Sequence, residues 1–92
     1  TEEDLNKVLD LELNKVLKRL EVRDIKFSLT TKAKEFLLKK GYNPEYGARP
    51  LRRAISTFVE DLVAELILSN QVTTGEFILD LDSTGEKLSL AT

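Results

Sequence analysis

Three arginines at the expected start of a helix have the clearest chemical potential in this sequence. The segment 41–55 reads GYNPEYGARPLRRAI and places Arg49, Arg52 and Arg53 close together. Guanidinium groups bind phosphate and carboxylate oxygens through paired, charge-assisted hydrogen bonds. The free N–H groups and positive dipole end of a helix start add further attraction for an anion. The pattern therefore predicts an anion-binding corner of the kind that holds a phosphate group.

For the helix itself, these arginines stand at an unfavourable position. Proline favours the first helical position and pushes the residue before it towards extended backbone, so we expect the helix to start at Pro50 with Arg49 at or next to its N-cap. Each exposed cation at the positive end of a helix costs up to about 1 kcal/mol, and a good capping residue is missing. Such a local conflict often marks a functional site. Ion pairs with acids on neighbouring elements explain the arginines equally well, and both interpretations stay open here.

The charge of this segment differs from that of the rest of the chain. From Lys39 to Arg53 there are five basic residues and one acid, a net charge of +4, whereas the 92-residue chain carries −2. The acidic remainder gives no reason to expect a nucleic acid as partner. On composition alone, the alternative is a stand-alone α+β binding module whose basic loop docks an acidic partner or RNA.

Several kinds of active site are excluded by residues that the sequence lacks. Without cysteine there are no disulfides or thiolate metal sites, and without histidine the commonest general base and metal ligand are missing. No phosphate-loop motif occurs, and no nucleophile stands beside a plausible base. Asp80 and Asp82 share a face of an expected strand, and we interpret them as solvated rather than metal-binding. We therefore expect no catalytic residue and no metal site in this chain.

Apolar residues at helical spacing predict three helices, at about 3–20, 31–40 and 50–69. Thr1 is expected to cap the first helix, and Thr30 or Thr31 the second. Gly41 is expected at the C′ position, just after the second helix. Ser56 and Thr57 are weak helix formers, so a kink or break is expected in the third helix.

Alternating apolar residues predict short strands at about 25–29, 77–81 and 88–90, the last two joined by a turn at 83–85. The order of elements predicts a single α+β domain over residues 1–92, with three to four helices and a small two- to three-stranded sheet that contains an antiparallel pair. Tyr42 and Tyr46 are interpreted as packing residues that close the loop over the helices.

The sequence contains no run of about 18 uncharged apolar residues, so no membrane-spanning helix is expected. The first residues are acidic, which argues against a secretory or transit peptide. Because no initiator methionine is present, we expect a fragment of a longer protein or a processed product.

The segment with the arginines resembles the sensor-2 segment of the Clp unfoldases, the ring-forming AAA+ ATPases of the ClpB and ClpC group. The G-A-R-P-L-R-R core in its G-Y-N-P-E-Y context is long and specific, and the resemblance covers essentially the whole chain. It favours ClpC, bacterial or plastid, over ClpB. It implies that residues 1–92 form the C-terminal small subdomain, or lid, of the second ATPase module of a larger ATPase.

The resemblance also implies roles for individual residues. Arg49 is implied to reach the γ-phosphate of ATP and to sense its hydrolysis. Arg52 and Arg53 match basic positions that serve the lid surface or the contact with a neighbouring subunit. Small, proline and tyrosine residues around the arginine match the supports of the motif, namely Gly47, Ala48, Pro50, Tyr42 and Tyr46.

For the parent protein, the resemblance implies an ATPase that couples hydrolysis to protein unfolding and delivers its substrates to a ClpP-type protease. ATP with magnesium is expected in the parent, and none bound to the isolated fragment, because the Walker motifs belong to the large subdomain. The implied partners are the large AAA+ subdomain of the same chain, neighbouring subunits of a homohexamer, protein substrates, and the protease through regions outside this sequence. The implied compartment is the bacterial cytoplasm or the plastid stroma.

Overall fold

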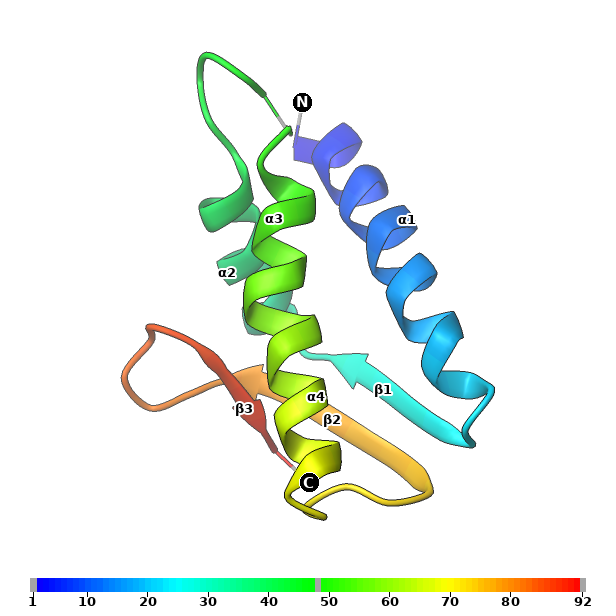
Figure 1. Ribbon diagram of the computed structural model, residues 1–92. Helices are drawn as coiled ribbons and strands as arrows, with labels where there is room; N and C mark the ends of the chain where they lie inside the picture. The colour runs from blue at the N-terminus through cyan, green and yellow to red at the C-terminus, as the bar shows by residue number, and fades with distance from the viewer. Residues whose placement is uncertain (1, 48, 92) are drawn as a thin grey trace.

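The computed structural model describes residues 2–47 and 49–91, which form the predicted α+β fold (Figure 1). Their elements are, in chain order, α1 (Glu2–Glu21), β1 (Ile25–Leu29), α2 (Thr31–Gly41), α3 (Leu51–Ile55), the π-helical segment η1 (Ser56–Glu60), α4 (Asp61–Leu68), β2 (Gly75–Leu81) and β3 (Leu88–Leu90). Each predicted helix and strand is present, and most of their ends lie within one or two residues of the predicted ones. The expected cap Thr1 lies outside the described residues. No helix among those described is long and apolar enough to cross a lipid bilayer.

The three strands form one mixed sheet in the order β1-β2-β3. β1 and β2 run parallel, with Ile25 opposite Gly75 and Leu29 opposite Leu79. β2 and β3 form the predicted antiparallel hairpin, in which Leu81 lies opposite Leu88. A parallel pair needs a long crossover connection, and here the crossover consists of α2, α3, η1 and α4. This arrangement brings the arginine segment to the end of the molecule away from the sheet (Figure 1).

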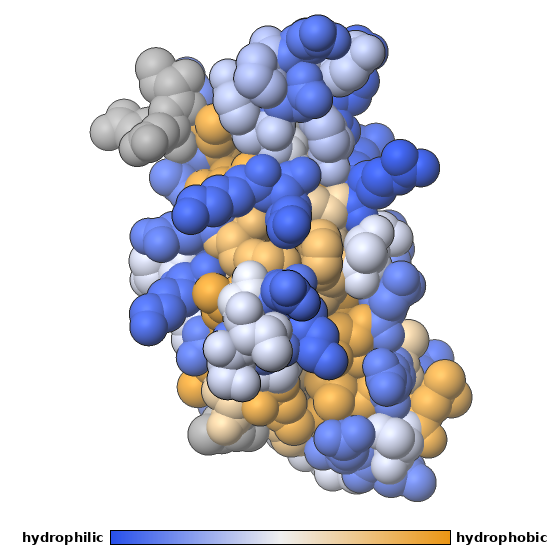
Figure 2. Space-filling model, turned by 90° about the vertical axis from the view of Figure 1, so that its left-hand side faces the viewer, coloured by the Kyte–Doolittle hydropathy of each residue, from blue (hydrophilic) through white to orange (hydrophobic). Residues whose placement is uncertain are grey.

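One face of the sheet and the inner sides of the helices share a single apolar core. The largest side chains that are almost completely buried come from every layer of the fold: Leu9, Leu37, Leu51, Ile55, Val59 and Leu79. On the side of the loop after α2 and of the β2–β3 hairpin, Figure 2 shows apolar surface between hydrophilic side chains. Leu51 and Ile55 belong to α3, so the core directly fixes the helix that follows the arginine loop.

The long helical rod formed by α3, η1 and α4 is interrupted where the sequence predicted a kink or break. η1 begins at Ser56, and the amide of Asp61 donates to the carbonyl of Ser56, five residues earlier. Such wide turns often occur as single π-helical insertions within α-helices. Val59 is completely buried, and the ring of Phe58 meets that of Phe36 edge-on at a centroid distance of 4.9 Å. The rod ends at Leu68, shortly before Asn70, which has a positive φ of 60°.

Gly41 has a different role from the predicted one. It is the last residue of α2 rather than the residue after it, and it is absent from the described residues with positive φ. An added Cβ would lie 2.5 Å from Cδ1 and 2.7 Å from Cα of Leu51. The prediction of a C′ glycine is therefore wrong: this glycine lets the end of α2 touch the start of α3.

Candidate functional site

The loop between α2 and α3 is closed by its own hydrogen bonds. The side chain of Asn43 accepts hydrogen bonds from the amides of Glu45 (2.7 Å) and Tyr46 (3.3 Å). Asn43 and Gly47 exchange two backbone hydrogen bonds, of 2.9 and 2.6 Å. Gly47 has a φ of 62°, a left-handed conformation that strains residues with a Cβ. These bonds give a tight turn immediately before the arginines, and Ala48 of the predicted motif lies outside the described residues.

Arg49 is exposed and lies in a turn in front of α3, where its amide donates to the carbonyl of Tyr46 at 3.2 Å. Within the two described ranges, its guanidinium makes no ion pair or side-chain hydrogen bond. Pro50 is the N-cap rather than the first helical residue, and no side chain caps the helix. The predicted lack of a good cap is therefore confirmed, and the start of the helix differs by one residue.

Arg52 pairs with an acid on a neighbouring element, which was one of the two predicted explanations of the arginines. Its Nε donates to Oε2 of Glu12 on α1 at 3.1 Å. Lys15, one turn along α1, donates to the other carboxylate oxygen at 3.3 Å. Partial burial raises the pKa of the Glu12 carboxyl, but the hydrogen bonds and charges of Arg52 and Lys15 outweigh this effect and hold the pKa below its ordinary value. Arg53 is exposed, and no ion pair of its side chain occurs in the part of the chain that the structure describes. The three arginines therefore have different environments.

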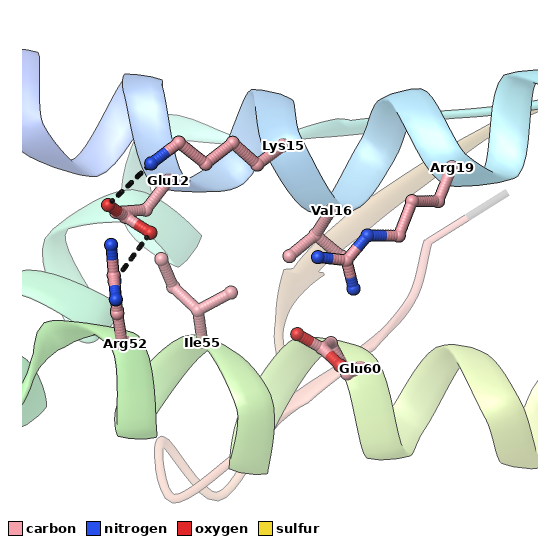
Figure 3. A pocket seen from close by; sticks show the side chains of 7 residues that line it. All are labelled: Glu12, Lys15, Val16, Arg19, Arg52, Ile55 and Glu60. Carbon is pink, nitrogen blue, oxygen red and sulfur yellow. Dashed lines mark hydrogen bonds and ion pairs between the residues drawn. The ribbon is translucent and has the colours of Figure 1, made fainter.

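Next to this ion pair lies a cavity of about 290 Å³ between α1 and the rod of α3 and η1 (Figure 3). Glu12, Lys15 and Arg52 lie at one end of it. At the other end, Arg19 from α1 and Glu60 from η1 extend towards one another. Val16 and Ile55 are the apolar residues of its lining. Charged groups therefore line most of this cavity, beside the apolar core to which α1 and α3 both contribute.

The two tyrosines of the loop do not pack over the helices. The exposed fraction is 49% for Tyr42 and 57% for Tyr46. Their interpretation as packing residues is therefore wrong within this chain, because the turn is closed by Asn43 and does not need their rings. That Gly47, Pro50 and the tyrosines support the arginine motif remains a prediction. Contact of Arg49 with a phosphate group also remains a prediction.

Asp80 was expected to be solvated, but it links the sheet to α2. Its carboxylate accepts hydrogen bonds from the hydroxyl of Thr30 at 2.6 Å and from the amide of Leu81 at 2.8 Å, and these bonds lower its pKa. Thr30 is also the N-cap of α2, because its oxygen accepts from the amide of Ala33 at 3.2 Å. Asp82 accepts from the side chain of Thr84 in the hairpin turn, and this bond likewise lowers its pKa. Both carboxylates are thus explained by local structure.

Sequence reasoning missed Glu12, Asp80 and Gly41 as structural partners. A signal existed for Glu12, which stands one helical turn before the inner-face residue Val16 and therefore points towards the same neighbour. In the described ranges, no group of three or more histidine, cysteine, aspartate or glutamate side chains is arranged to hold a metal ion. The arginine loop is therefore the candidate functional site.

Comparison with known proteins shows the class of protein: the chain is a domain of the Clp-type AAA+ chaperones. The family model described as the "C-terminal, D2-small domain, of ClpB protein" matches residues 1–79. The chain belongs to this family.

Similar proteins come from algae and plants. The chain is 40% identical over 87 residues to an "ATP-dependent Clp protease ATP-binding subunit ClpA homolog" of Porphyra purpurea, a match covering 94% of this chain and 11% of that protein. It is 41% identical over 91 residues to "Chaperone protein ClpC1, chloroplastic" of Oryza sativa subsp. japonica, covering 98% and 10%. It is 39% identical over 92 residues to "Chaperone protein ClpC2, chloroplastic" of Arabidopsis thaliana, covering 99% and 10%. The chain thus spans about a tenth of the length of these relatives.

Proposed function

We propose that this chain is the nucleotide-sensing lid of a Clp-type unfoldase and that Arg49 contacts the γ-phosphate of ATP. The observation that carries the proposal is the exposed guanidinium of Arg49, which makes no ion pair within the described chain and stands before a helix without a side-chain cap. Membership of the D2-small family and the sequence G-A-R-P-L-R-R support the same role.

The chemistry of the guanidinium fits this role. Its planar donors match two oxygens of a phosphate group, and such charge-assisted bonds are about twice as strong as neutral ones. Hydrolysis removes the γ-phosphate, so the orientation that the lid prefers changes with the nucleotide state. The ATP and its magnesium ion are held by the large subdomain of the parent, and the small domain contributes the sensing cation. The isolated chain is therefore expected to bind ATP weakly or not at all.

The parent protein is proposed to be a homohexamer that uses ATP to unfold proteins and passes them to a ClpP-type protease. In this assembly, the small domain packs on the large subdomains of its own and a neighbouring subunit, and the exposed Arg53 is available for the subunit contact. The relatives named as chloroplastic support the plastid stroma as the compartment, with the bacterial cytoplasm as the other compartment of this family.

Replacement of Arg49 by alanine in the full-length parent tests the sensing role. We expect kcat/KM for ATP hydrolysis to fall roughly tenfold to a hundredfold, because a charge-assisted contact is worth about 1.5–3 kcal/mol. Arg49→Lys keeps the charge but not the planar fork, so its activity should lie between those of Arg49→Ala and the parent. Arg23→Ala is the matched control, since Arg23 is also exposed but follows α1 at the sheet end of the molecule. Equal ATPase kinetics in Arg49→Ala and the parent would refute the proposal.

A further inference from the structure

The contact between Glu12 and Arg52 ties the first turn of α3 to α1 at the partly exposed edge of their apolar contact. The carboxylate of Glu12 receives Arg52 Nε at 3.1 Å and Lys15 Nζ at 3.3 Å. Immediately beyond this contact, α1 and α3 are separated by the cavity of about 290 Å³. The side chain of Glu12 is only 18% exposed, so its carboxylate is held in place, whereas that of Arg52 is 75% exposed. The ion pair therefore adds a polar contact between the first turn of α3 and α1, beside the apolar core to which both helices contribute.

The backbone between Arg52 and Arg49 transmits this constraint. Pro50 stands between them with a φ of −73°, which its ring fixes. On one side, the amide of Arg49 is bonded to Tyr46, and on the other the amide of Ala54 is bonded to the carbonyl of Pro50 at 3.0 Å. The direction in which the side chain of Arg49 points therefore depends on the orientation of the first turn of α3.

We propose that Glu12 is a positioning residue for Arg49: it binds Arg52, holds the start of α3 against α1 and so directs the guanidinium of Arg49 towards its phosphate. This inference rests on the function proposed above for Arg49. The same contact occupies Arg52 with a carboxylate, while Arg49 makes no ion pair in the described chain. Exposed ion pairs contribute little to stability, so the effect of Glu12 appears in geometry rather than in the melting temperature.

The 92-residue chain itself provides the first test. Glu12→Gln removes the charge with almost no change in shape, and the amides of Arg49 and Ala54 report on the turn through hydrogen exchange followed by NMR. We expect their exchange to accelerate roughly threefold to tenfold as the turn opens more often. Asp10→Asn is the matched control, because Asp10 is also on α1 but pairs with Lys34 on α2, at 3.3 Å. Exchange that is unchanged in Glu12→Gln, or equally accelerated in both variants, would overturn the inference.

Nucleotide discrimination in the full-length parent provides the second test. Glu12→Gln should weaken ATP binding roughly threefold to tenfold and leave ADP binding unchanged, because a misdirected Arg49 loses contact only with the γ-phosphate. A merely structural role would change both affinities together. Exchange of the two residues, Glu12→Arg with Arg52→Glu, should restore the preference for ATP.

The two proposals fail in different ways. If Arg49→Ala weakens ATP binding and Glu12→Gln does not, the positioning role is wrong and the sensing role stands. If Arg49→Ala has no effect, the sensing role fails, and the positioning role fails with it, whatever the exchange rates of Glu12→Gln show about the turn.

Discussion

At the scale of single residues, three similar arginines acquire different roles through their neighbours. Arg52 binds a carboxylate forty positions earlier in the chain, while no ion pair of Arg49 occurs in the described ranges. The sequence indicated an arginine-rich helix start and left anion binding and ion pairing open. The choice could not be made from the sequence, because it depends on which acid of α1 faces α3. The missing cap was correctly predicted, because it depends on adjacent residues alone.

A prediction at this scale concerns Gly41, because Leu51 occupies the space that a Cβ at this position would need. Gly41→Ala places a methyl group 2.5 Å from a side-chain atom and 2.7 Å from a backbone atom of Leu51. Leu51 is only 1% exposed, so it cannot move aside without disturbing the core. We expect a loss of about 1–3 kcal/mol, the usual cost of overpacking, measured by urea unfolding.

Gly47→Ala is the comparison, since an added Cβ at this glycine meets nothing within 4 Å. Its cost arises only from the positive φ of 62° and should be about 1 kcal/mol. Gly47→Asn should cost less, because asparagine tolerates this conformation better. If Gly41→Ala were as stable as the unsubstituted chain, the close contact between α2 and α3 would be refuted.

At the scale of elements, the sequence predicted local structure better than long-range pairing. The helices, the strands and the hairpin turn followed from spacing and turn residues, and the weak helix formers Ser56 and Thr57 coincide with the start of η1. The parallel pairing of β1 with β2 was not predicted, because it joins residues fifty positions apart. The bond between Asp80 and Thr30 was missed for the same reason, since it depends on that pairing.

The carboxylates with lowered pKa predict how stability depends on pH. The pKa values of Asp80 and Asp82 lie below the ordinary 3.8 in the folded protein. Above this ordinary value the charged, hydrogen-bonded forms contribute their full stabilisation. As the pH falls below it, the unfolded chain takes up protons first and the stabilisation is progressively lost. The melting temperature should therefore be nearly constant from pH 7 to about pH 5 and decrease below that.

Asp80→Asn isolates one contribution to this decrease. The amide keeps an acceptor oxygen for Thr30 and Leu81 but cannot be protonated in this range. We expect a smaller loss of melting temperature between about pH 4.5 and pH 2.5 than in the unsubstituted chain, measured by circular dichroism. Glu35→Gln, at an exposed position on α2, is the control and should follow the unsubstituted curve. Identical curves for Asp80→Asn and the unsubstituted chain would contradict the assigned role of the carboxylate.

At the scale of the whole molecule, the α+β class and the Clp family were both predicted from the sequence, the class from its periodicity and the family from its resemblance. The G-A-R-P-L-R-R core made the resemblance specific, and the family match over residues 1–79 confirms it. The chain covers about a tenth of the length of these relatives, so the activity of a whole ATPase is a proposal that rests on the resemblance.

The charge of the whole molecule predicts that the chain does not bind RNA. The net charge is −2, and the basic side chains of Lys34 and Arg52 contact acids of α1. Nucleic-acid binding depends on a continuous basic surface that releases counterions from phosphates. Fluorescence anisotropy with a labelled single-stranded RNA should therefore show no binding at low salt. Binding that disappears on salt titration would restore the alternative of a stand-alone binding module.

The parallel pairing of β1 with β2 also has a consequence for synthesis of the chain. β2 is the central strand of the sheet, yet it follows its partner β1 by fifty residues along the chain. Until residues 75–81 leave the ribosome, the nascent β1 has no strand to pair with, and its apolar side chains Ile25 and Phe27 lack part of their cover. Contacts between distant residues form late and slow the folding of a domain. The sheet is therefore completed only after all the described helices have been translated, and a ribosome that stalls before Gly75 holds a chain with an open, aggregation-prone edge.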